Sequence, residues 1–403
     1  MRLVVERLGH LGDGIAPGPV FVPMALPGEE VEGEVVCGRM VDAKIVTPSP
    51  DRVKPACPHY RACGGCGLMH ASDGFVAGWK ADVVRTALAA QGLGAPFRPV
   101  VTSPPHSRRR ATLSGRRTKK GALVGFHGRA SGTIVEIAGC RLLDPALMAA
   151  LPILTEVTTL GASRKGEVAL TVTVTEGGLD LAVMDGKPLD QSLFSALATL
   201  TKRAGLARIV WNGEPVVSRY PAAQRFGAAR VVPPSGAFLQ ATGAGETALV
   251  GAVREAVGTA KKIADLFAGA GTFSLPLADR AEVHAVEGEA AMLAALDAGW
   301  RQTAGLHRVT TEARDLFRRP LLPDELARFE AVVIDPPRAG AEAQARTLAG
   351  SGVRVIAAVS CHPVTFARDA RILSDAGFAI DWVQVVDQFR WSPHVELVAR
   401  FSR

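Results

Sequence analysis

Three residues in the last third of the chain combine a thiol with two carboxyl groups. Cys361 stands in the string VSCHP, 26 positions after Asp335 of DPPR and 35 positions before Glu396 of HVE. A thiolate can add to an electron-poor ring carbon, and a carboxylate can remove the proton that such chemistry leaves on the ring. Because the surrounding segment is typical of a nucleotide-cofactor fold, this combination indicates chemistry on a pyrimidine ring.

Methylation of uracil at carbon 5 would need both groups. Carbon 5 is a poor nucleophile, so addition of a thiolate at carbon 6 must first make an enolate that can attack a sulfonium methyl. A lone cysteine is more often a buried small hydrophobe, but Cys361 follows an apolar strand and precedes Pro363 and a predicted helix. We therefore expect it at the carboxyl edge of a sheet, where a helix N-terminus would favour the thiolate. Glu396 could be the base or only a solvated glutamate at a strand end.

A second group of residues is typical of a cofactor site. The string DLFAGAG (265–271) predicts a strand that runs into a glycine turn, and HAVEG places Glu287 at the tip of the next strand. Glycines let the backbone approach a cofactor, and a carboxylate at that tip can accept hydrogen bonds from both ribose hydroxyls. A dinucleotide fingerprint would have a third glycine where Ser274 stands, which favours S-adenosylmethionine. Asp315 in EARDL could hold the adenine amine or could cap a helix.

Asp335 ends the fourth predicted strand of this segment. The two prolines after it fix an extended turn that aims the carboxylate out of the sheet. Similar turns occur in enzymes that methylate exocyclic amines, but those usually carry an aromatic residue after the prolines, where Arg338 stands here. Methylation of an exocyclic amine is therefore disfavoured.

Three compositional zones must position these residues. Residues 1–50 alternate apolar and small polar residues between Gly and Pro turns, which predicts a small β-barrel. Residues 51–235 contain a cysteine cluster, a basic run and strand-like segments, which are typical of an α+β domain. In residues 236–403, apolar strands alternate with Ala-rich helical stretches, which predicts an open parallel sheet in an α/β Rossmann-like domain.

Four of the six cysteines form a further candidate site. Cys57, Cys63 and Cys66 have the spacing C-x5-C-x2-C, and Cys140 lies far downstream in IAGCRLLD. Four thiolates suit either a zinc ion or an iron–sulfur cluster. Zinc ribbons favour two C-x2-C pairs, and only one is present. A disulfide pair is disfavoured because we expect a cytoplasmic protein.

Charge and hydropathy limit the partners of the chain. Its 46 Lys and Arg exceed its 39 Asp and Glu, which favours a polyanionic partner. The run SRRRATLSGRRTKK is usually read as a solvated face, but beside a base-modifying centre it favours phosphate binding. No stretch of about 18 uncharged apolar residues and no cleavable apolar leader is present, so we expect neither a membrane span nor secretion. The basic residues of this run are Arg108, Arg109, Arg110, Arg116, Arg117, Lys119 and Lys120.

The strings DLFAGAGTFSLPLA, VEG, DPPRAG, VSCHPVTFARD and HVELVA resemble the RNA uracil-5-methyltransferase family of RumA type. The resemblance covers nearly the whole chain, including SGAFLQAT and an N-terminal segment, GHLGDGIAPGPVFVPMALPGE, that looks like a TRAM domain. It implies that Cys361 is the nucleophile and Glu396 the base. It also implies six cofactor-binding residues: Gln240, Phe267, Thr272, Glu287, Asp315 and Asp335.

The same resemblance implies that the four cysteines hold a 4Fe-4S cluster with a structural or RNA-docking role. It further implies that residues 69–101 fold with the catalytic half. The sequence departs from the family pattern at His362, Thr272 and Asp315, where the family usually or often has asparagine, and in the string RWSPHVE. These departures concern contacts within the site and leave the reaction as implied.

The sequence thus predicts a monomeric cytoplasmic enzyme of three domains that methylates carbon 5 of a uridine in 23S ribosomal RNA. The base would have to leave its stack to reach Cys361. One alternative is the same reaction on the T-loop uridine of transfer RNA. Another is a non-catalytic RNA-binding module whose barrel and cluster dock RNA, and Cys361 and Glu396 are the residues that separate it from an enzyme.

Overall fold

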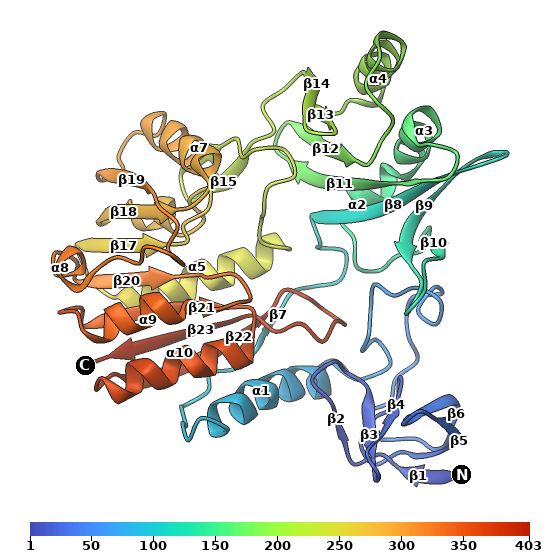
Figure 1. Ribbon diagram of the computed structural model, residues 1–403, viewed down its shortest axis with the longest axis horizontal. Coiled ribbons are helices and arrows are strands. Elements are labelled where there is room, and N and C mark those ends of the chain that lie inside the picture. Colours follow the sequence, from blue (N-terminus) through green and yellow to red (C-terminus); the bar gives the residue numbers. More distant parts are fainter.

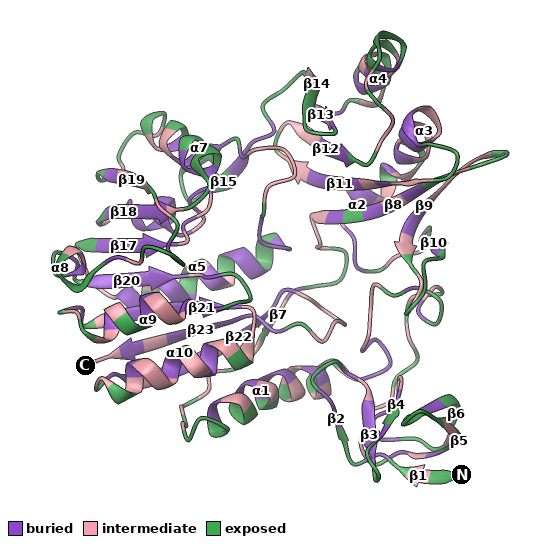
Figure 2. Ribbon diagram, viewed as in Figure 1, coloured by how far each residue is buried: buried purple, intermediate pink, exposed green.

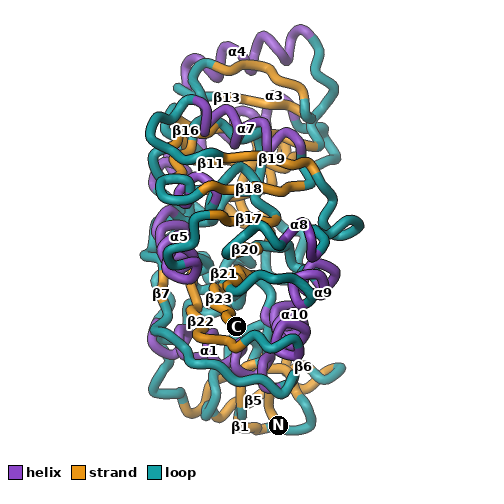
Figure 3. The backbone as a smooth tube through the Cα atoms, turned by 90° about the vertical axis from the view of Figure 1, so that its left-hand side faces the viewer, coloured by secondary structure: helices purple, strands orange, loops and turns teal.

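A computed structural model describes residues 1–403 and shows three large β-sheets, each with its own hydrophobic core, and one two-stranded sheet. Figure 1 shows the C-terminal sheet on one side of the molecule and the other two large sheets on the opposite side. In Figure 3 the N-terminal sheet lies at one end of the molecule, and α4 (Gln191–Ala204) lies at the other.

The N-terminal sheet has six strands in the order β1-β5-β6-β4-β3-β2. They are β1 (Arg2–Val4), β2 (Arg7–Leu8), β3 (Gly14–Ala16), β4 (Val20–Val22), β5 (Glu30–Val36) and β6 (Arg39–Thr47). β1 and β2 follow each other in the chain but occupy the two ends of this order, so the sheet curls until its edges meet. Buried Val22, Val31 and Met40 pack inside it. The predicted strand-rich N-terminal domain is confirmed.

The middle sheet has seven strands in the order β10-β9-β8-β11-β12-β13-β14. They are β8 (Arg110–Thr118), β9 (Gly121–His127), β10 (Ile134–Glu136), β11 (Glu167–Thr175), β12 (Gly178–Met184), β13 (Arg208–Trp211) and β14 (Glu214–Ser218). Only β12 and β13 pair in parallel, because α4 connects them as a crossover helix. Two further helices, α2 (Pro145–Ala149) and α3 (Leu151–Gly161), pack into the same core.

The C-terminal sheet has eight strands in the order β19-β18-β17-β20-β21-β23-β22-β7. They are β7 (Val101–Thr102), β17 (Lys262–Leu266), β18 (Glu282–Glu287), β19 (Val309–Ala313), β20 (Ala331–Ile334), β21 (Val355–Ser360), β22 (Ala379–Asp387) and β23 (Leu397–Ser402). β23 runs antiparallel to both β21 and β22. The open parallel sheet expected from the sequence is therefore a mixed sheet, because residues 388–396 connect β22 to β23 without a crossover helix.

Helices cover both faces of the C-terminal sheet, as Figure 3 shows. α5 (Gly243–Val257), α6 (Ser274–Leu277) and α7 (Ala290–Arg301) contribute to the core on one face, and α9 (Glu342–Ala349) and α10 (Pro363–Asp375) to the core on the other. The short α8 (Pro323–Leu326) joins the second group. The strands between these layers are largely buried (Figure 2). In a sheet covered in this way, ligands bind at the carboxyl ends of the strands.

Two earlier segments of the chain also pack with the C-terminal sheet. α1 (Asp73–Ala89) adds Val84 and Leu88 to the core below α10, and β7 pairs with β22. The hairpin of β15 (Gln224–Phe226) and β16 (Ala229–Val231) joins the core on the opposite face, although it precedes the predicted boundary at residue 236. We therefore propose that residues 69–101 and the hairpin belong to the same unit as residues 236–403.

No helix is both long enough and apolar enough to cross a membrane.

Candidate active site

The carboxyl ends of the parallel strands open into one large cavity. Its volume is about 890 Å³, and residues that follow β17, β18, β19, β20 and β21 line it. Two of the eight residues predicted for catalysis or cofactor binding, Gln240 and Thr272, do not line it. The other six line this cavity: Phe267, Glu287, Asp315, Asp335, Cys361 and Glu396.

The glycine turn after β17 holds Glu287 at the tip of β18. The backbone N–H of Gly269 donates to one carboxylate oxygen of Glu287 at 3.1 Å, and that of Glu289 donates to the other at 2.9 Å. Gly269 and Gly271 have φ angles of 55° and 98°, and a Cβ on Gly271 would lie 2.9 Å from the Leu275 side chain. The turn therefore requires glycine, and it leaves the remaining lone pairs of Glu287 free for the hydroxyls of a ligand.

Two phenylalanine rings border the same part of the cavity. Phe267 has a φ of 62°, which is an unusual backbone conformation for a bulky residue and marks strain of the kind found at functional sites. Its ring centroid lies 5.4 Å from that of Phe317, which is 48% exposed. Such a surface suits a purine ring. Our sequence reasoning missed Phe317. The only indication of its role in the sequence was its position, two residues after the predicted cofactor-binding residue Asp315.

Asp315 caps the turn that carries Phe317. One of its carboxylate oxygens accepts hydrogen bonds from the backbone N–H groups of Phe317 at 3.0 Å and Arg318 at 3.3 Å. The interpretation of Asp315 as a capping residue therefore agrees with the geometry, but the segment that it caps is a turn and not the expected helix. The side chain is 46% exposed and lines the cavity, so it can also contact a ligand.

Cys361 and Glu396 are neighbours across two strands. Ser360 at the end of β21 pairs with Leu397 at the start of β23, so the next residue on each side faces the cavity. The antiparallel direction of β23 thus joins two residues that are 35 positions apart in the chain. This relationship follows from the strand register and could not be read from either string alone.

Burial controls the protonation of these groups. Burial, followed by the charges of Glu396 and Asp335, raises the pKa of Cys361 to about 11, although the Arg338 guanidinium acts in the opposite direction. Burial also raises the pKa of Glu396 to about 7 and that of Asp335 well above its ordinary value. The expected helix is present, with His362 as the N-cap of α10. Burial and the two carboxyl groups outweigh any stabilisation of a thiolate that the N-terminus of this helix provides.

A buried amide connects Glu396 to Gln240. The Gln388 Nε2 donates to Glu396 Oε2 at 3.1 Å and to Gln240 Oε1 at 2.5 Å, while its Oε1 accepts the Ala241 N–H at 2.8 Å. Gln240 is 1% exposed and therefore supports the cavity from outside its lining. Thr272 is half-buried in the turn between β17 and α6.

The wall beside the thiol carries an aromatic and cationic cluster. The Arg338 Nη2 donates to His394 Nδ1 at 2.8 Å, and burial followed by the charge of Arg338 lowers the pKa of His394, so the imidazole is the acceptor. The ring centroids of Phe389 and His394 lie 5.7 Å apart, and the Arg108 guanidinium lies 5.8 Å from the Phe389 ring. Aromatic faces and guanidinium groups are the surfaces on which unstacked bases bind. Our sequence reasoning gave Phe389 and His394 no role, although His394 is part of the string RWSPHVE and Phe389 directly precedes it.

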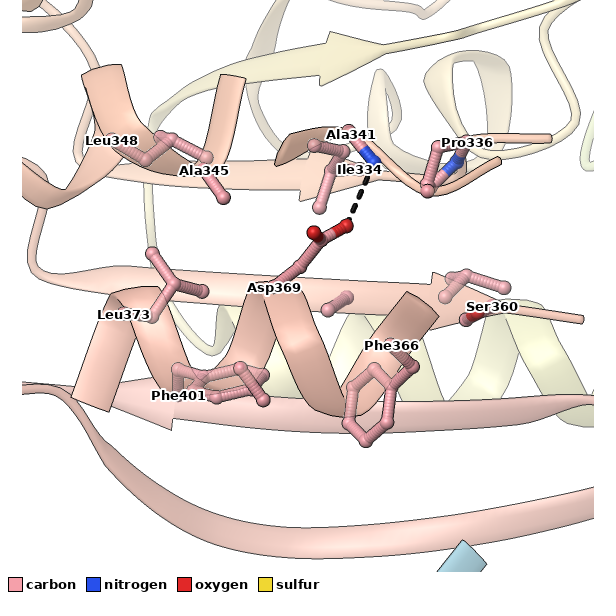
Figure 4. A pocket seen from close by; sticks show the side chains of 14 residues that line it. Ile334, Pro336, Ala341, Ala345, Leu348, Ser360, Phe366, Asp369, Leu373 and Phe401 are labelled. Carbon is pink, nitrogen blue, oxygen red and sulfur yellow. Dashed lines mark hydrogen bonds between the residues drawn. The ribbon is translucent and has the colours of Figure 1, made fainter. Parts of the chain in front are cut away.

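The turn that carries Asp335 is held by α10. Asp369 accepts the Ala341 N–H at 2.7 Å, and a Cβ on Gly340, whose φ is 74°, would lie 2.7 Å from the Asp369 carboxylate. Figure 4 shows Asp369 in the small cavity between these segments. This cavity has a volume of about 30 Å³, so it has room for little more than a water molecule and is no ligand site.

Asp265 is a buried carboxyl group to which the sequence reasoning gave no role of its own. The Ser274 hydroxyl donates to its Oδ2 at 2.6 Å, whereas Oδ1 is buried without a partner. Burial raises the pKa of Asp265 to about 7. The serine that stands in place of a third glycine thus fixes this carboxyl group below the glycine turn.

All four predicted ligand cysteines line one pocket: Cys57, Cys63, Cys66 and Cys140. The Gly65 N–H donates to Cys63 Sγ and the Leu142 N–H donates to Cys140 Sγ, each at 3.4 Å. Burial, followed by the charges of the other three thiols, raises the pKa of Cys66 to about 12. No group of three or more His, Cys, Asp or Glu side chains is arranged around a single metal-ion position.

The basic run is not one solvated face. Arg109 forms an ion pair with Glu246, which is 9% exposed, and Arg110 donates to the Gly236 carbonyl at 2.8 Å. Both arginines stabilise the join between the start of β8 and residues 236–246, so this geometry favours a structural role for them over the predicted phosphate binding. At the other end of the run, the side chains at 119–120 are exposed in the turn between β8 and β9.

A family model described as tRNA (uracil-5-)-methyltransferase matches residues 197–402. The chain belongs to this family. RNA methyltransferases of Brucella suis and Rhizobium meliloti are 43% and 44% identical to it, over 100% of this chain and 98% and 99% of theirs. The 23S rRNA (uracil(1939)-C(5))-methyltransferase of Halomonas elongata is 35% identical over 98% of this chain and 88% of that protein.

A solved structure matches the fold of the whole chain. It is the Pyrococcus abyssi tRNA (uracil-54, C5)-methyltransferase in complex with S-adenosyl-L-homocysteine, with a TM-score of 0.78 and 24% identity over 100% of this chain and 99% of that one. The predicted membership of the uracil-5-methyltransferase family is confirmed, and so is the prediction of an RNA-methylating enzyme. The alternative of a non-catalytic RNA-binding module is excluded.

Proposed function

We propose that this uracil-5-methyltransferase methylates carbon 5 of a uridine in 23S ribosomal RNA, with S-adenosylmethionine as methyl donor. The observation that carries the proposal is the single cavity in which the Cys361 thiol, the buried Glu396, the half-buried Asp335 and a nucleoside-sized surface meet. The Halomonas elongata relative is named for this reaction on 23S rRNA. Transfer RNA is the second candidate substrate, because the family model and the Pyrococcus abyssi enzyme are named for it.

The methyl donor fits the part of the cavity bordered by Phe267, Phe317, Glu287 and Asp315. S-adenosylmethionine supplies an electrophilic methyl group on a sulfonium sulfur. In our proposal Glu287 accepts hydrogen bonds from the ribose hydroxyls, the two rings contact the adenine, and Asp315 accepts a hydrogen bond from the adenine amine. The predicted contacts of Gln240, Thr272 and Asp335 with the donor remain part of the proposal. For Gln240 the structure favours a supporting position behind the cavity.

Cys361 and Glu396 divide the reaction between them. The Cys361 sulfur adds to carbon 6 of uracil, and the electrons of the C5–C6 double bond move into an enolate. Carbon 5 then takes the methyl group, and S-adenosylhomocysteine is released. Glu396 removes the proton from carbon 5, the C5–C6 double bond forms again, and the bond between carbon 6 and sulfur breaks. A base with a pKa of about 7 suits this step near neutral pH.

The nucleophile must be activated after the RNA binds. A cysteine with a pKa of about 11 is a thiol at neutral pH, so its proton must leave before the sulfur adds. In our proposal the neighbouring Asp335 carboxylate, whose pKa is raised well above its ordinary value, takes this proton and returns it when the thiolate is released, so Glu396 stays ionised for the later step. The Arg338 guanidinium favours the thiolate. A base that enters the cavity between Arg338 and Phe389 would displace water from these groups and bring carbon 6 to the sulfur.

We also propose that the four-cysteine pocket holds a 4Fe-4S cluster. In such a cluster each thiolate ligates a different iron, so the sulfurs surround a cube and not one ion. The shared pocket and the two backbone N–H groups that point at sulfur support this. Anaerobically purified protein should be brown and carry about four irons per chain. Stoichiometric zinc without iron would contradict the assignment.

The N-terminal sheet is proposed to be a TRAM-like domain that binds RNA, since its strands curl into a small sheet that lies beside α1 (Figure 1) and Met24 packs against the same apolar cluster as three of the four ligand cysteines. We further propose that the protein acts as a monomer, because residues of one chain line the whole cavity.

The test of the proposed function uses unmodified transcripts of 23S rRNA and transfer RNA with labelled S-adenosylmethionine. We expect 5-methyluridine in the 23S transcript, and none with Cys361→Ala, which should still bind the cofactor. A transcript with 5-fluorouridine at the target should remain covalently attached to the enzyme. Label in transfer RNA alone would establish the second candidate, and no transfer to either RNA would refute the proposal.

A further inference from the structure

We propose that Gln388 is a positioning residue for proton removal from carbon 5, because it holds the Glu396 carboxylate in place. This inference rests on the proposed role of Glu396 as the base. Gln388 makes no contact with the reacting atoms, and it is not one of the site residues predicted from the sequence.

The hydrogen bonds of the Gln388 amide are fully assigned. Both amide hydrogens have an acceptor, Glu396 Oε2 at 3.1 Å and Gln240 Oε1 at 2.5 Å, and the amide oxygen accepts the Ala241 N–H at 2.8 Å. Rotation of the amide by half a turn would place its oxygen against two other oxygens and its NH₂ group against an N–H. Only one orientation therefore satisfies all partners, and a buried amide gains nothing from leaving it.

Packing also restricts Gln388. Gln388 and Gln240 are each 1% exposed and Glu396 is 4% exposed. A Cβ on Gly245, in the first turn of α5, would lie 2.6 Å from the Gln388 Cβ, so this helix approaches the backbone of Gln388 as closely as glycine allows. The amide thus links three segments: the residues before α5, the end of β22 and the start of β23.

Several charged or titratable groups face Glu396 or lie next to it. Asp335 at the end of β20 and Cys361 at the end of β21 share its buried surroundings, and His394 precedes it by two residues. The residue before Gln388 is Asp387, which forms a buried ion pair with Lys80 of α1. Arg338 reaches this group through its hydrogen bond to the His394 imidazole. None of these gives Glu396 a hydrogen bond in the structure.

The Gln388 amide acts on Glu396 in a definite direction. Burial raises the pKa of Glu396 to about 7, and the hydrogen bond from Gln388 is the interaction that lowers it. Loss of that bond must therefore raise the pKa further. Since the base works in its ionised form, the rate of proton removal would then reach its plateau only at a higher pH.

The test compares Gln388→Met with the wild-type enzyme and with Gln344→Met. Methionine keeps the length of the side chain but donates no hydrogen bond. Gln344, which lies in α9 and outside the cavity, is a matched control. It is 0% exposed, and both ends of its amide form hydrogen bonds with the backbone of Leu321. The measurement is the decay of the covalent enzyme–RNA adduct in a single turnover on an unmodified 23S rRNA transcript, at pH values from 6 to 9.5.

Gln388→Met should release the methylated RNA ~10- to 100-fold more slowly at pH 7, the order expected when a reacting group loses its position. The difference in release rate between this variant and the wild-type enzyme should become smaller as the pH rises. The affinity for S-adenosylmethionine should be nearly unchanged. Gln388→Glu, which places a second carboxylate beside the base, should move the profile further in the same direction. Gln344→Met should lower the melting temperature without moving the profile.

An unchanged pH profile in both Gln388 variants, or an equal loss at every pH, would overturn the proposal. Failure of the proposed function would look different. If Glu396→Gln released methylated RNA at the normal rate, Glu396 would not be the base. The proposed mechanism would then be refuted independently of any result for Gln388. If Glu396→Gln accumulated the adduct while Gln388→Met released it normally at pH 7, only the role of Gln388 would be refuted.

Discussion

The protonation of Cys361 gives the sharpest test of the site. Burial and two carboxyl groups raise its pKa from 9.0 to about 11. Each pKa unit is a factor of ten in the thiolate fraction, so at neutral pH Cys361 should hold ~100-fold less thiolate than an ordinary cysteine. We therefore predict slow alkylation by iodoacetamide in the free enzyme, with a rate that still rises between pH 9 and 10.

The assay maps alkylated peptides by mass spectrometry, with exposed Cys37 as the reference for reagent access. Glu396→Gln removes a charge that opposes the thiolate, so it should lower the pKa of Cys361 and speed its alkylation at pH 8. Replacement of exposed Glu214 by Gln is the control and should change nothing. A Cys361 rate that levels off below pH 9, or that does not respond to Glu396→Gln, would show that the two carboxyl groups do not set the pKa.

Three further predictions concern stability, cofactor and RNA. Lys80→Met should lower the free energy of unfolding by about 3–5 kcal/mol in urea titrations, because it leaves the buried Asp387 charge unpaired, and a second change of Asp387→Asn should restore part of the loss. Phe317→Ala should weaken S-adenosylmethionine binding up to about tenfold by calorimetry, as expected for loss of one aromatic contact, and unchanged affinity would place the adenine elsewhere. Lys119→Glu with Lys120→Glu should reduce the salt dependence of RNA binding by roughly one unit of slope for each lost phosphate contact; an unchanged slope would remove this turn from the RNA surface.

Much of the C-terminal sheet was predictable because its strands are short apolar runs that end in glycine, proline or a carboxylate. The segments around Asp265, Glu287, Asp335 and Cys361 all form the predicted strands. The direction of β23 was not predictable, since a buried antiparallel strand has the same apolar run as a parallel one. The closeness of Cys361 and Glu396 to each other depends on that direction.

The other features that could not be predicted involve partners that are distant in the chain. Arg109 belongs to a basic run by sequence, yet its ion pair is with Glu246, 137 positions later. Gln388 has no local motif, and its role depends on the positions of Gln240 and Glu396. The raised pKa of Cys361 could not be predicted, because a helix N-terminus is visible in a sequence, whereas the burial of the thiol and the nearness of two carboxyl groups are not.

The insertion of β23 between β21 and β22 makes the two reacting side chains depend on one strand pairing. Cys361 follows β21, whereas Glu396 immediately precedes β23, which pairs with β21 on one side and with β22 on the other. Displacement of β23 would therefore leave Cys361 in place but remove Glu396 from the cavity. Under the proposed mechanism, such a molecule could form the covalent adduct with RNA but could not resolve it, so the pairing of this strand decides whether the enzyme turns over.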